Sequence, residues 1–163
     1  MKRIILQVER YTTGLSLHAA CILLGLISVL GLWQVAARFI LEQPSSWTEE
    51  VMRRLLIWMV MLGTVAAFRQ GALVSVDLML RLTRGRWRQG VRWIITLTHF
   101  SFLATVFYFG VQLVQRVRFQ TFASVDLSMA WAYGALPVGA LLALLAVLAH
   151  HLDPRSKELE LAQ

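Results

Sequence analysis

The sequence has a single cysteine and only nine acidic residues among its 163, and none of the acidic residues lies in the middle of a long apolar segment. A single cysteine excludes a disulfide within the chain, so Cys21 is expected to be a small core residue. A nucleotide-binding loop, a nucleophile with its base and a pair of catalytic carboxylates are also missing. The sequence therefore predicts no enzyme, and no catalytic, metal-binding or substrate-binding residue.

Apolar residues make up 58% of the chain, and the mean hydropathy is +0.63. They gather in four segments, and a bilayer core of about 30 Å needs about 20 apolar residues to span it. We predict spans at about 15–37, 48–70, 92–113 and 131–149. The second has the shortest apolar run and is long enough only if its flanking arginines extend toward the headgroups. The prediction is one all-α integral membrane domain over residues 1–163, with four transmembrane helices.

The net charge of +7 would suit a nucleic-acid-binding protein, but its distribution argues for a membrane orientation. Eleven of the 16 Lys and Arg lie near the two termini or in the central loop, and five lie near the other two connections. Because cytoplasmic loops carry the excess of Lys and Arg, we expect both termini in the cytoplasm. Short amphipathic helices at about 2–12 and 74–83 are expected on the cytoplasmic headgroups. The predicted interfacial anchor on that side comprises Asp77, Arg81, Arg84 and Trp87.

Two histidines lie within the predicted spans. His99 is expected to be neutral and hydrogen-bonded to a neighbouring helix, since no carboxylate lies in the middle of a span to complete a proton pathway. A different interpretation pairs His18 with His99 as the two axial ligands of a b-type haem. The chain would then be the membrane anchor of an oxidoreductase, and an absorption spectrum would test this alternative.

The connection between the first two spans carries the richest set of polar side chains. Ser46 and Glu49 have the S-x-x-E spacing of a capping box, which predicts that the second helix starts there. The two glutamates lie three or four residues before two arginines, as ion pairs on a helix do. Arg38 is expected to be held by Glu49 or Glu50. The predicted rim, which closes the hairpin and can also dock another protein, comprises Arg38, Trp47, Glu49, Glu50 and Arg53.

Small residues recur along one face of the last span at positions 135, 139 and 143. This spacing lets a second helix backbone approach closely within a membrane. Two small residues of the second span are expected to serve the same purpose. The positions predicted for helix packing or subunit contact are Gly63, Ala67, Ala135, Gly139 and Ala143.

Over almost its full length the sequence resembles the small membrane subunit of tripartite ATP-independent periplasmic (TRAP) transporters, the DctQ-type family. The longer matching motifs are Ser-Trp-Thr-Glu-Glu at 46–50, Arg-Gln-Gly-Ala at 69–72, Val-Asp-Leu at 76–78 and Leu-Pro-Val-Gly at 136–139. The single matching residues are Arg38, Arg53, Trp58, Gly63, Trp131 and Tyr133. The family often has a histidine after the Gly-Ala pair, where this chain has Leu73.

The resemblance implies a non-catalytic scaffold subunit, without a cofactor, in the inner membrane of a bacterium. Its implied partners are a large membrane subunit, a periplasmic solute-binding protein and membrane lipid, with no nucleic acid. The large subunit would import a carboxylate-type solute by an elevator motion driven by a sodium gradient. The lack of charged residues in mid-span agrees with a scaffold, and it disfavours a self-sufficient multidrug exporter, which would need an intramembrane carboxylate.

Overall fold

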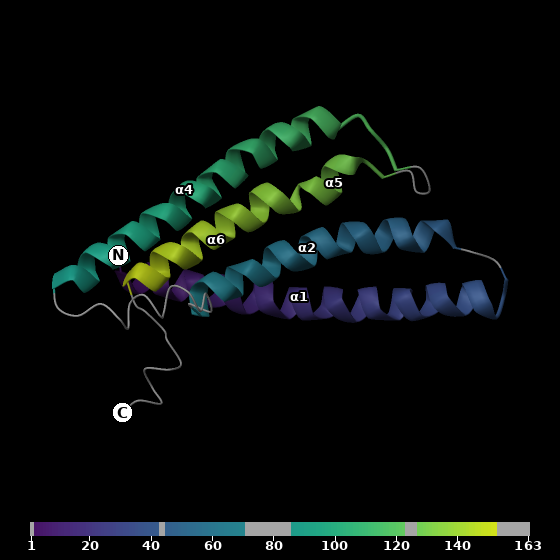
Figure 1. Cartoon of the computed structure of the whole chain (residues 1–163), viewed down its shortest axis with the longest axis horizontal. Coiled ribbons are helices and arrows are strands. Elements are labelled where there is room, and N and C mark those ends of the chain that lie inside the picture. Colours follow the sequence, from purple (N-terminus) through teal and green to yellow (C-terminus); the bar gives the residue numbers. More distant parts are fainter. Residues whose placement is uncertain (1, 43–44, 71–85, 123–126, 153–163) are drawn as a thin grey trace, which may run out of the picture.

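The computed structural model describes residues 2–42, 45–70, 86–122 and 127–152. In chain order the helices are α1 (Lys2–Phe39), α2 (Ser46–Gln70), α4 (Arg86–Val117), α5 (Met129–Tyr133) and α6 (Ala135–Leu152) (Figure 1). Four segments are long and apolar enough to cross a membrane: Leu6–Phe39, Ser46–Arg69, Gln89–Val117 and Met129–His151. The predicted all-α fold with four candidate spans is confirmed, whereas the side on which the termini lie stays a prediction.

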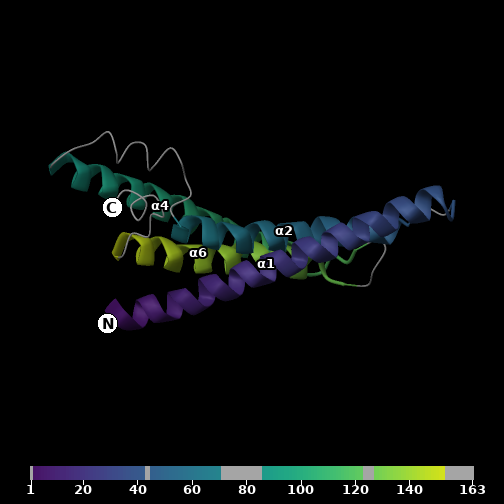
Figure 2. The same ribbon diagram turned by 90° about the horizontal axis from the view of Figure 1, so that it is seen from below.

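The long helices lie side by side in the order α1, α2, α6, α4 (Figures 1 and 2). The second helix packs against both α1 and α6, and α6 packs against both α2 and α4. The first helix also approaches α6 from below in the view of Figure 2. This is an open layer and not a closed bundle, because α1 and α4 lie at opposite edges with α2 and α6 between them.

Alanine makes α6 the inner helix of the layer. Its side chains at 135, 140, 143, 146 and 149 are at most 1% exposed, which lets the neighbouring backbones approach closely. A Cβ placed on Gly139 would lie only 2.7 Å from Cβ of Met61 in α2, and one on Gly110 of α4 would lie 3.2 Å from Cδ of Pro137. Val65 and Leu103 complete a small core where α2, α6 and α4 meet.

The last span is divided at Gly134 into α5 and α6. Pro137 has no N–H to donate to the carbonyl four residues earlier, so one helical hydrogen bond is missing at this point. The N–H of Gly134 still donates to the carbonyl of Ala130 at 2.8 Å, and that of Val138 donates to the carbonyl of Gly134 at 3.2 Å. The chain therefore passes through the break without leaving the helical path.

The first helix is one unbroken element of 38 residues, about 57 Å long. We expected a separate interfacial helix at about 2–12 before a span at 15–37, but the structure continues a single helix through both segments. The physical reason is that Glu9 is buried and paired with Arg69 of α2, which holds this part of α1 against its neighbour. The other expected interfacial helix, at 74–83, lies outside the described residues.

Candidate functional site at the two ends of the helix layer

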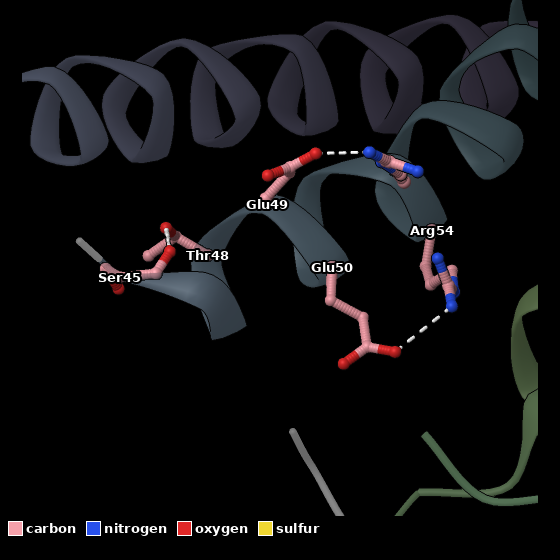
Figure 3. A network of polar contacts seen from close by, with 6 residues as sticks. Ser45, Thr48, Glu49, Glu50 and Arg54 are labelled. Atoms are coloured by element: carbon pink, nitrogen blue, oxygen red, sulfur yellow. Dashed lines mark hydrogen bonds and ion pairs between the residues drawn. The ribbon is translucent and has the colours of Figure 1, made fainter. Parts of the chain in front are cut away.

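Two ion pairs lie within α2 near its first turn, at the end of the layer where α1 joins α2, here called the hairpin end (Figure 3). Arg53 is paired with Glu49, and Nη2 of Arg54 lies 3.2 Å from Oε1 of Glu50. The side chains of the first pair are 69% and 51% exposed, and those of the second are 20% and 16% exposed. Because solvent screens exposed ion pairs, the mostly enclosed Glu50–Arg54 pair is expected to contribute more to stability than the exposed Glu49–Arg53 pair.

Arg54 also joins α2 to the second connection of the hairpin end. The centre of its guanidinium group lies 4.6 Å from the ring centroid of Phe122, whose side chain is buried. The N–H of Phe122 donates to the carbonyl of Leu127 at 3.1 Å, which links the segment after α4 to the segment before α5. Arg54 is therefore held between a carboxylate of its own helix and an aromatic ring that follows α4.

A second link lies one turn further along α2. The indole N–H of Trp58 donates to the carbonyl of Trp131 at 3.1 Å, and the two ring centroids are 5.9 Å apart. The resemblance pointed to both tryptophans, but sequence reasoning gave no reason to place them together. Arg54 and Phe122 were also missed as a contact, since 68 positions separate them and no local pattern brings them together.

Arg38 does not join these pairs. It ends α1 as an exposed side chain and forms no ion pair within the part of the chain that the structure describes. The expected contact of Arg38 with Glu49 or Glu50 is absent because each carboxylate is paired with an arginine one turn further along α2. Trp47 is exposed at the same end, and the role of the rim in docking another protein stays a prediction.

The start of α2 at Ser46 is as predicted, but the capping box is not formed. Glu49 points forward to Arg53 and does not reach back to the start of the helix. A buried hydroxyl closes the turn instead, because Thr48 donates to the carbonyl of Ser45 at 2.7 Å (Figure 3).

At the opposite end of the layer, where α1 begins and α6 ends, a second polar cluster starts with an ion pair between helices. Oε2 of Glu9 in α1 lies 2.8 Å from Nε of Arg69 in α2, and the two side chains are 2% and 4% exposed. Oε1 of Glu9 also accepts a hydrogen bond from the hydroxyl of Thr13 at 2.7 Å. A buried carboxylate thus meets a buried guanidinium at the boundary between the first two spans.

Two consecutive histidines extend this cluster to the remaining helices. Nδ1 of His150 lies 3.2 Å from the carbonyl oxygen of Arg69, which links α6 to α2. Nδ1 of His151 lies 2.9 Å from the hydroxyl of Thr96, and its ring centroid lies 4.6 Å from that of Trp93, which links α6 to α4. All four long helices are therefore joined at one end. We call this set the terminal belt: Glu9, Thr13, Arg69, Thr96, His150 and His151.

Sequence reasoning missed the terminal belt. It placed Glu9 on a lipid-facing helix and treated Arg69 as a side chain extending to the headgroups. The available signal was one acidic and one basic residue at the ends of spans predicted to lie on the same side of the membrane. Of the predicted interfacial anchor, Asp77, Arg81 and Arg84 lie outside the described residues, and Trp87 is exposed at the start of α4.

The positions predicted for helix packing divide into two kinds. Ala135 and Ala143 are fully buried, and Gly139 lies against Met61 of α2. A Cβ on Gly63, in contrast, would meet nothing within 4 Å, so close packing within the chain does not explain this glycine. Ala67 is half-buried on the same helix. The assignment of Gly63 and Ala67 to a subunit interface stays a prediction.

The two span histidines lie apart and do not face one another. His99 of α4 meets the ring of Phe68 edge-on, with centroids 5.3 Å apart, and bonds to the backbone of Ile95 in its own helix. It was expected to bond to a neighbouring helix, but among the described residues its contact with another helix is this ring contact with Phe68. His18 is exposed on α1 at the far edge of the layer. This placement does not support a haem held between them.

The described residues offer structural contacts and no catalytic centre. They contain no group of three or more His, Cys, Asp or Glu that could hold a metal ion. Their four acidic residues, Glu9, Glu42, Glu49 and Glu50, all lie at the two ends of the layer. Between the ends, the helices expose mainly large apolar side chains. Such a layer suits contacts with lipid and with other membrane helices.

Comparison with known proteins agrees with this description. Residues 27–155 match the family model described as the DctQ component of tripartite ATP-independent periplasmic transporters. The chain is 27% identical over 139 residues to the sialic acid TRAP transporter small permease protein SiaQ of Vibrio cholerae, covering 85% of this chain and 76% of that protein. It is 28% identical over 109 residues to the sialic acid TRAP transporter permease protein SiaT of Haemophilus influenzae. That match covers 67% of this chain but only 18% of the longer permease.

Proposed function

The chain belongs to the DctQ component family of TRAP transporters, and we propose that it is the non-catalytic scaffold on which the large permease subunit of its transporter moves. The family and the four candidate spans make it a small permease subunit, a multi-pass protein of the bacterial inner membrane and a transporter component that is not an enzyme. Its partners are a large permease subunit and a periplasmic binding protein. In the finer proposal, the large subunit moves the solute and this chain holds the large subunit in place in the membrane.

One observation carries the scaffold proposal. In the described residues no acidic side chain lies between the hairpin end and the terminal belt, so the middle of the layer has no carboxylate with which to bind a cation. Ionisable groups inside a membrane normally mark the pathways of ions and substrates. The sodium site and the solute site therefore belong to the large subunit in this proposal. Side-chain contacts join the helices at both ends of the layer. These contacts support a rigid subunit, relative to which part of the large subunit can make an elevator motion.

The proposed solute is a carboxylate. Both relatives named above are sialic acid transporter proteins, and sialic acid carries a carboxylate group. Specificity would lie in the binding protein and the large subunit, because this chain offers no buried cationic pocket among its described residues. Arg69 is the buried arginine there, and Glu9 already neutralises it.

Reconstitution tests the proposal. The large subunit, this chain and the binding protein are placed together in proteoliposomes, and uptake of labelled sialic acid is measured with an inward sodium gradient. Uptake is expected only when all three are present, and this chain alone is expected to transport nothing. Transport by this chain alone, or equal uptake when it is left out, would overturn the scaffold role. Uptake that is independent of sodium would overturn the proposed coupling ion.

A further inference from the structure

We propose that the outward face of α1 is the surface on which a transmembrane helix of the large permease subunit packs, and that His18 accepts a hydrogen bond from that helix. This inference rests on the proposed function and assigns the partner to one edge of the layer. The surface, called the α1 docking face, has positions i, i+4, i+7, i+11 and i+14 of one helix. Its residues are Gly14, His18, Cys21, Gly25 and Ser28.

The α1 docking face points away from the rest of the chain. The opposite side of α1 is buried against its neighbours through Ser16, Ala20 and Ala37. On the docking face, in contrast, His18, Cys21 and Ser28 are exposed. A Cβ placed on either glycine of this face would meet nothing within 4 Å. The layer itself therefore leaves this side of α1 open.

The shape of this surface suits a helix. The small residues form a strip between two rows of larger side chains, with Leu17 and Leu24 along one side and Ile22 and Val29 along the other, all of them exposed. In membranes such strips allow the backbones of two helices to approach, and the flanking side chains then pack around the partner. Contact with lipid chains does not require such a strip, because a uniformly bulky helix surface packs against lipid equally well.

His18 points independently to a protein partner and specifies its chemistry. Its Nδ1 lies 2.7 Å from the carbonyl oxygen of Gly14, so Nδ1 carries the proton and donates. In the uncharged tautomer with the proton on Nδ1, the other ring nitrogen is an acceptor, and it has no partner among the described residues. Lipid chains offer no hydrogen bond to such a group. The partner helix must therefore present a donor, such as a hydroxyl, a carboxamide or an indole N–H.

The other edge of the layer has bulkier side chains and no exposed histidine among its described residues. The outward side of α4 is bulky, with Leu97, Phe102 and Tyr108 all exposed. Two hydroxyls on this side, those of Thr98 and Thr105, each donate to a carbonyl of their own helix at 2.9 Å. This edge suits lipid. The comparison of the two edges therefore favours α1 as the side that meets the large subunit.

The relation to the longer permease supports direct contact. The matched region makes up 18% of that relative, so a region like this chain and a much larger region share one polypeptide there. The two regions then lie in the same membrane at a fixed separation along the chain. An open helix face with an unpaired acceptor is where such a neighbour would pack.

The single cysteine makes the test direct. Cys21 lies on the α1 docking face, so its reaction with N-ethylmaleimide is measured in detergent for the isolated chain and for the purified complex with the large subunit. We expect the complex to slow the reaction at least about tenfold, because a packed helix covers the thiol. The matched control replaces Cys21 by alanine and carries Leu97→Cys on α4, and it is expected to react equally in both forms.

Two sets of variants test the same surface by assembly. Gly25→Leu has room within this chain, so it should fold normally yet lower co-purification of the large subunit severalfold, whereas Ser101→Leu on the outward side of α4 should not. His18→Leu is expected to weaken assembly about three- to tenfold, and His18→Gln, which keeps an acceptor, should restore most of it.

The results of these experiments distinguish a failure of the docking inference from a failure of the proposed function. If the native chain never co-purifies with a large permease, both are wrong. If the complex forms but Cys21 reacts as fast as in the isolated chain and Gly25→Leu assembles normally, the docking inference alone is overturned. Protection of Cys21 that grows with the concentration of the isolated chain would assign the face to a second copy, which would overturn it as well.

Discussion

Oε2 of Glu9 and Nε of Arg69 lie 2.8 Å apart, and they join the first two spans through side chains that are almost completely buried. A buried ion pair adds little net stability compared with apolar packing, but loss of one partner leaves the other charge without compensation. The terminal belt built on this pair connects all four long helices. Its members are therefore the first places where substitutions should distinguish a rigid layer from four loosely associated helices.

Glu9→Ala is expected to destabilise the folded chain by about 3–5 kcal/mol, because Arg69 would remain buried without this carboxylate. Denaturant unfolding in detergent measures the change. The double variant Glu9→Leu/Arg69→Met, which removes both charges, should be more stable than either single variant. Thr13→Val removes only a neutral donor to Glu9 and should cost about 1 kcal/mol. Additive effects of the two charge removals would contradict the interpretation of this contact as an ion pair.

The four spans could be predicted from the sequence because the thickness of a bilayer determines how many apolar residues each needs. The predicted second span, 48–70, agrees with α2 to within two residues at its start. The sequence did not predict that α1 continues unbroken from residues 2–12 into the span, since a helix that carries charges can lie on lipid or pack on protein. Which of these occurs at Glu9 depends on a partner 60 positions away along the chain.

The candidate site was predictable only where its contacts are local. The spacing of Glu49 and Arg53 on one helix was enough to predict that pair. The contact between Arg54 and Phe122 depends on the order of helices in the layer, which in turn depends on how closely alanine and glycine let α6 approach α2 and α4. No local spacing in the sequence predicts the order of the helices in the layer. Arg38 was misplaced for the same reason, because its distance from Glu49 depends on the path of the hairpin.

Gly139→Ala tests the close approach of α2 and α6. The added Cβ would lie 2.7 Å from Cβ of Met61, so the helices must separate, and we expect a loss of about 1–3 kcal/mol in the free energy of unfolding. Met61→Ala should not rescue the variant, because its Cβ remains, whereas Met61→Gly should. Gly25→Ala, at an open position, serves as the control and should not destabilise the isolated chain. Equal unfolding midpoints for the two glycine variants would show that α6 does not pack closely on α2.

Thr96→Val tests the link between α4 and α6 at the terminal belt. The substitution keeps the shape of the side chain but removes the hydroxyl that lies 2.9 Å from Nδ1 of His151. We expect a loss of about 1 kcal/mol, measured by thermal unfolding in detergent. Thr98→Val is the matched control, since that hydroxyl bonds within its own helix and faces outward. A double-mutant cycle with His151→Phe should show coupling for Thr96 and none for Thr98.

Arg54→Ala should disturb the hairpin end far more than Arg53→Ala, although the two arginines are adjacent in the sequence. Removal of Arg54 leaves Glu50 mostly enclosed without this cation and takes the guanidinium from the ring of Phe122, for an expected loss of about 1–3 kcal/mol. Removal of Arg53 breaks an exposed pair, whose contribution is about 0–1 kcal/mol. Arg54→Lys should lie between them, because lysine keeps the charge but lacks the planar group that stacks on the ring. Thermal unfolding in detergent ranks the three variants, and solute uptake by the reconstituted transporter shows whether the second connection must be held for transport. Equal unfolding midpoints for Arg53→Ala and Arg54→Ala would contradict the role assigned to Arg54.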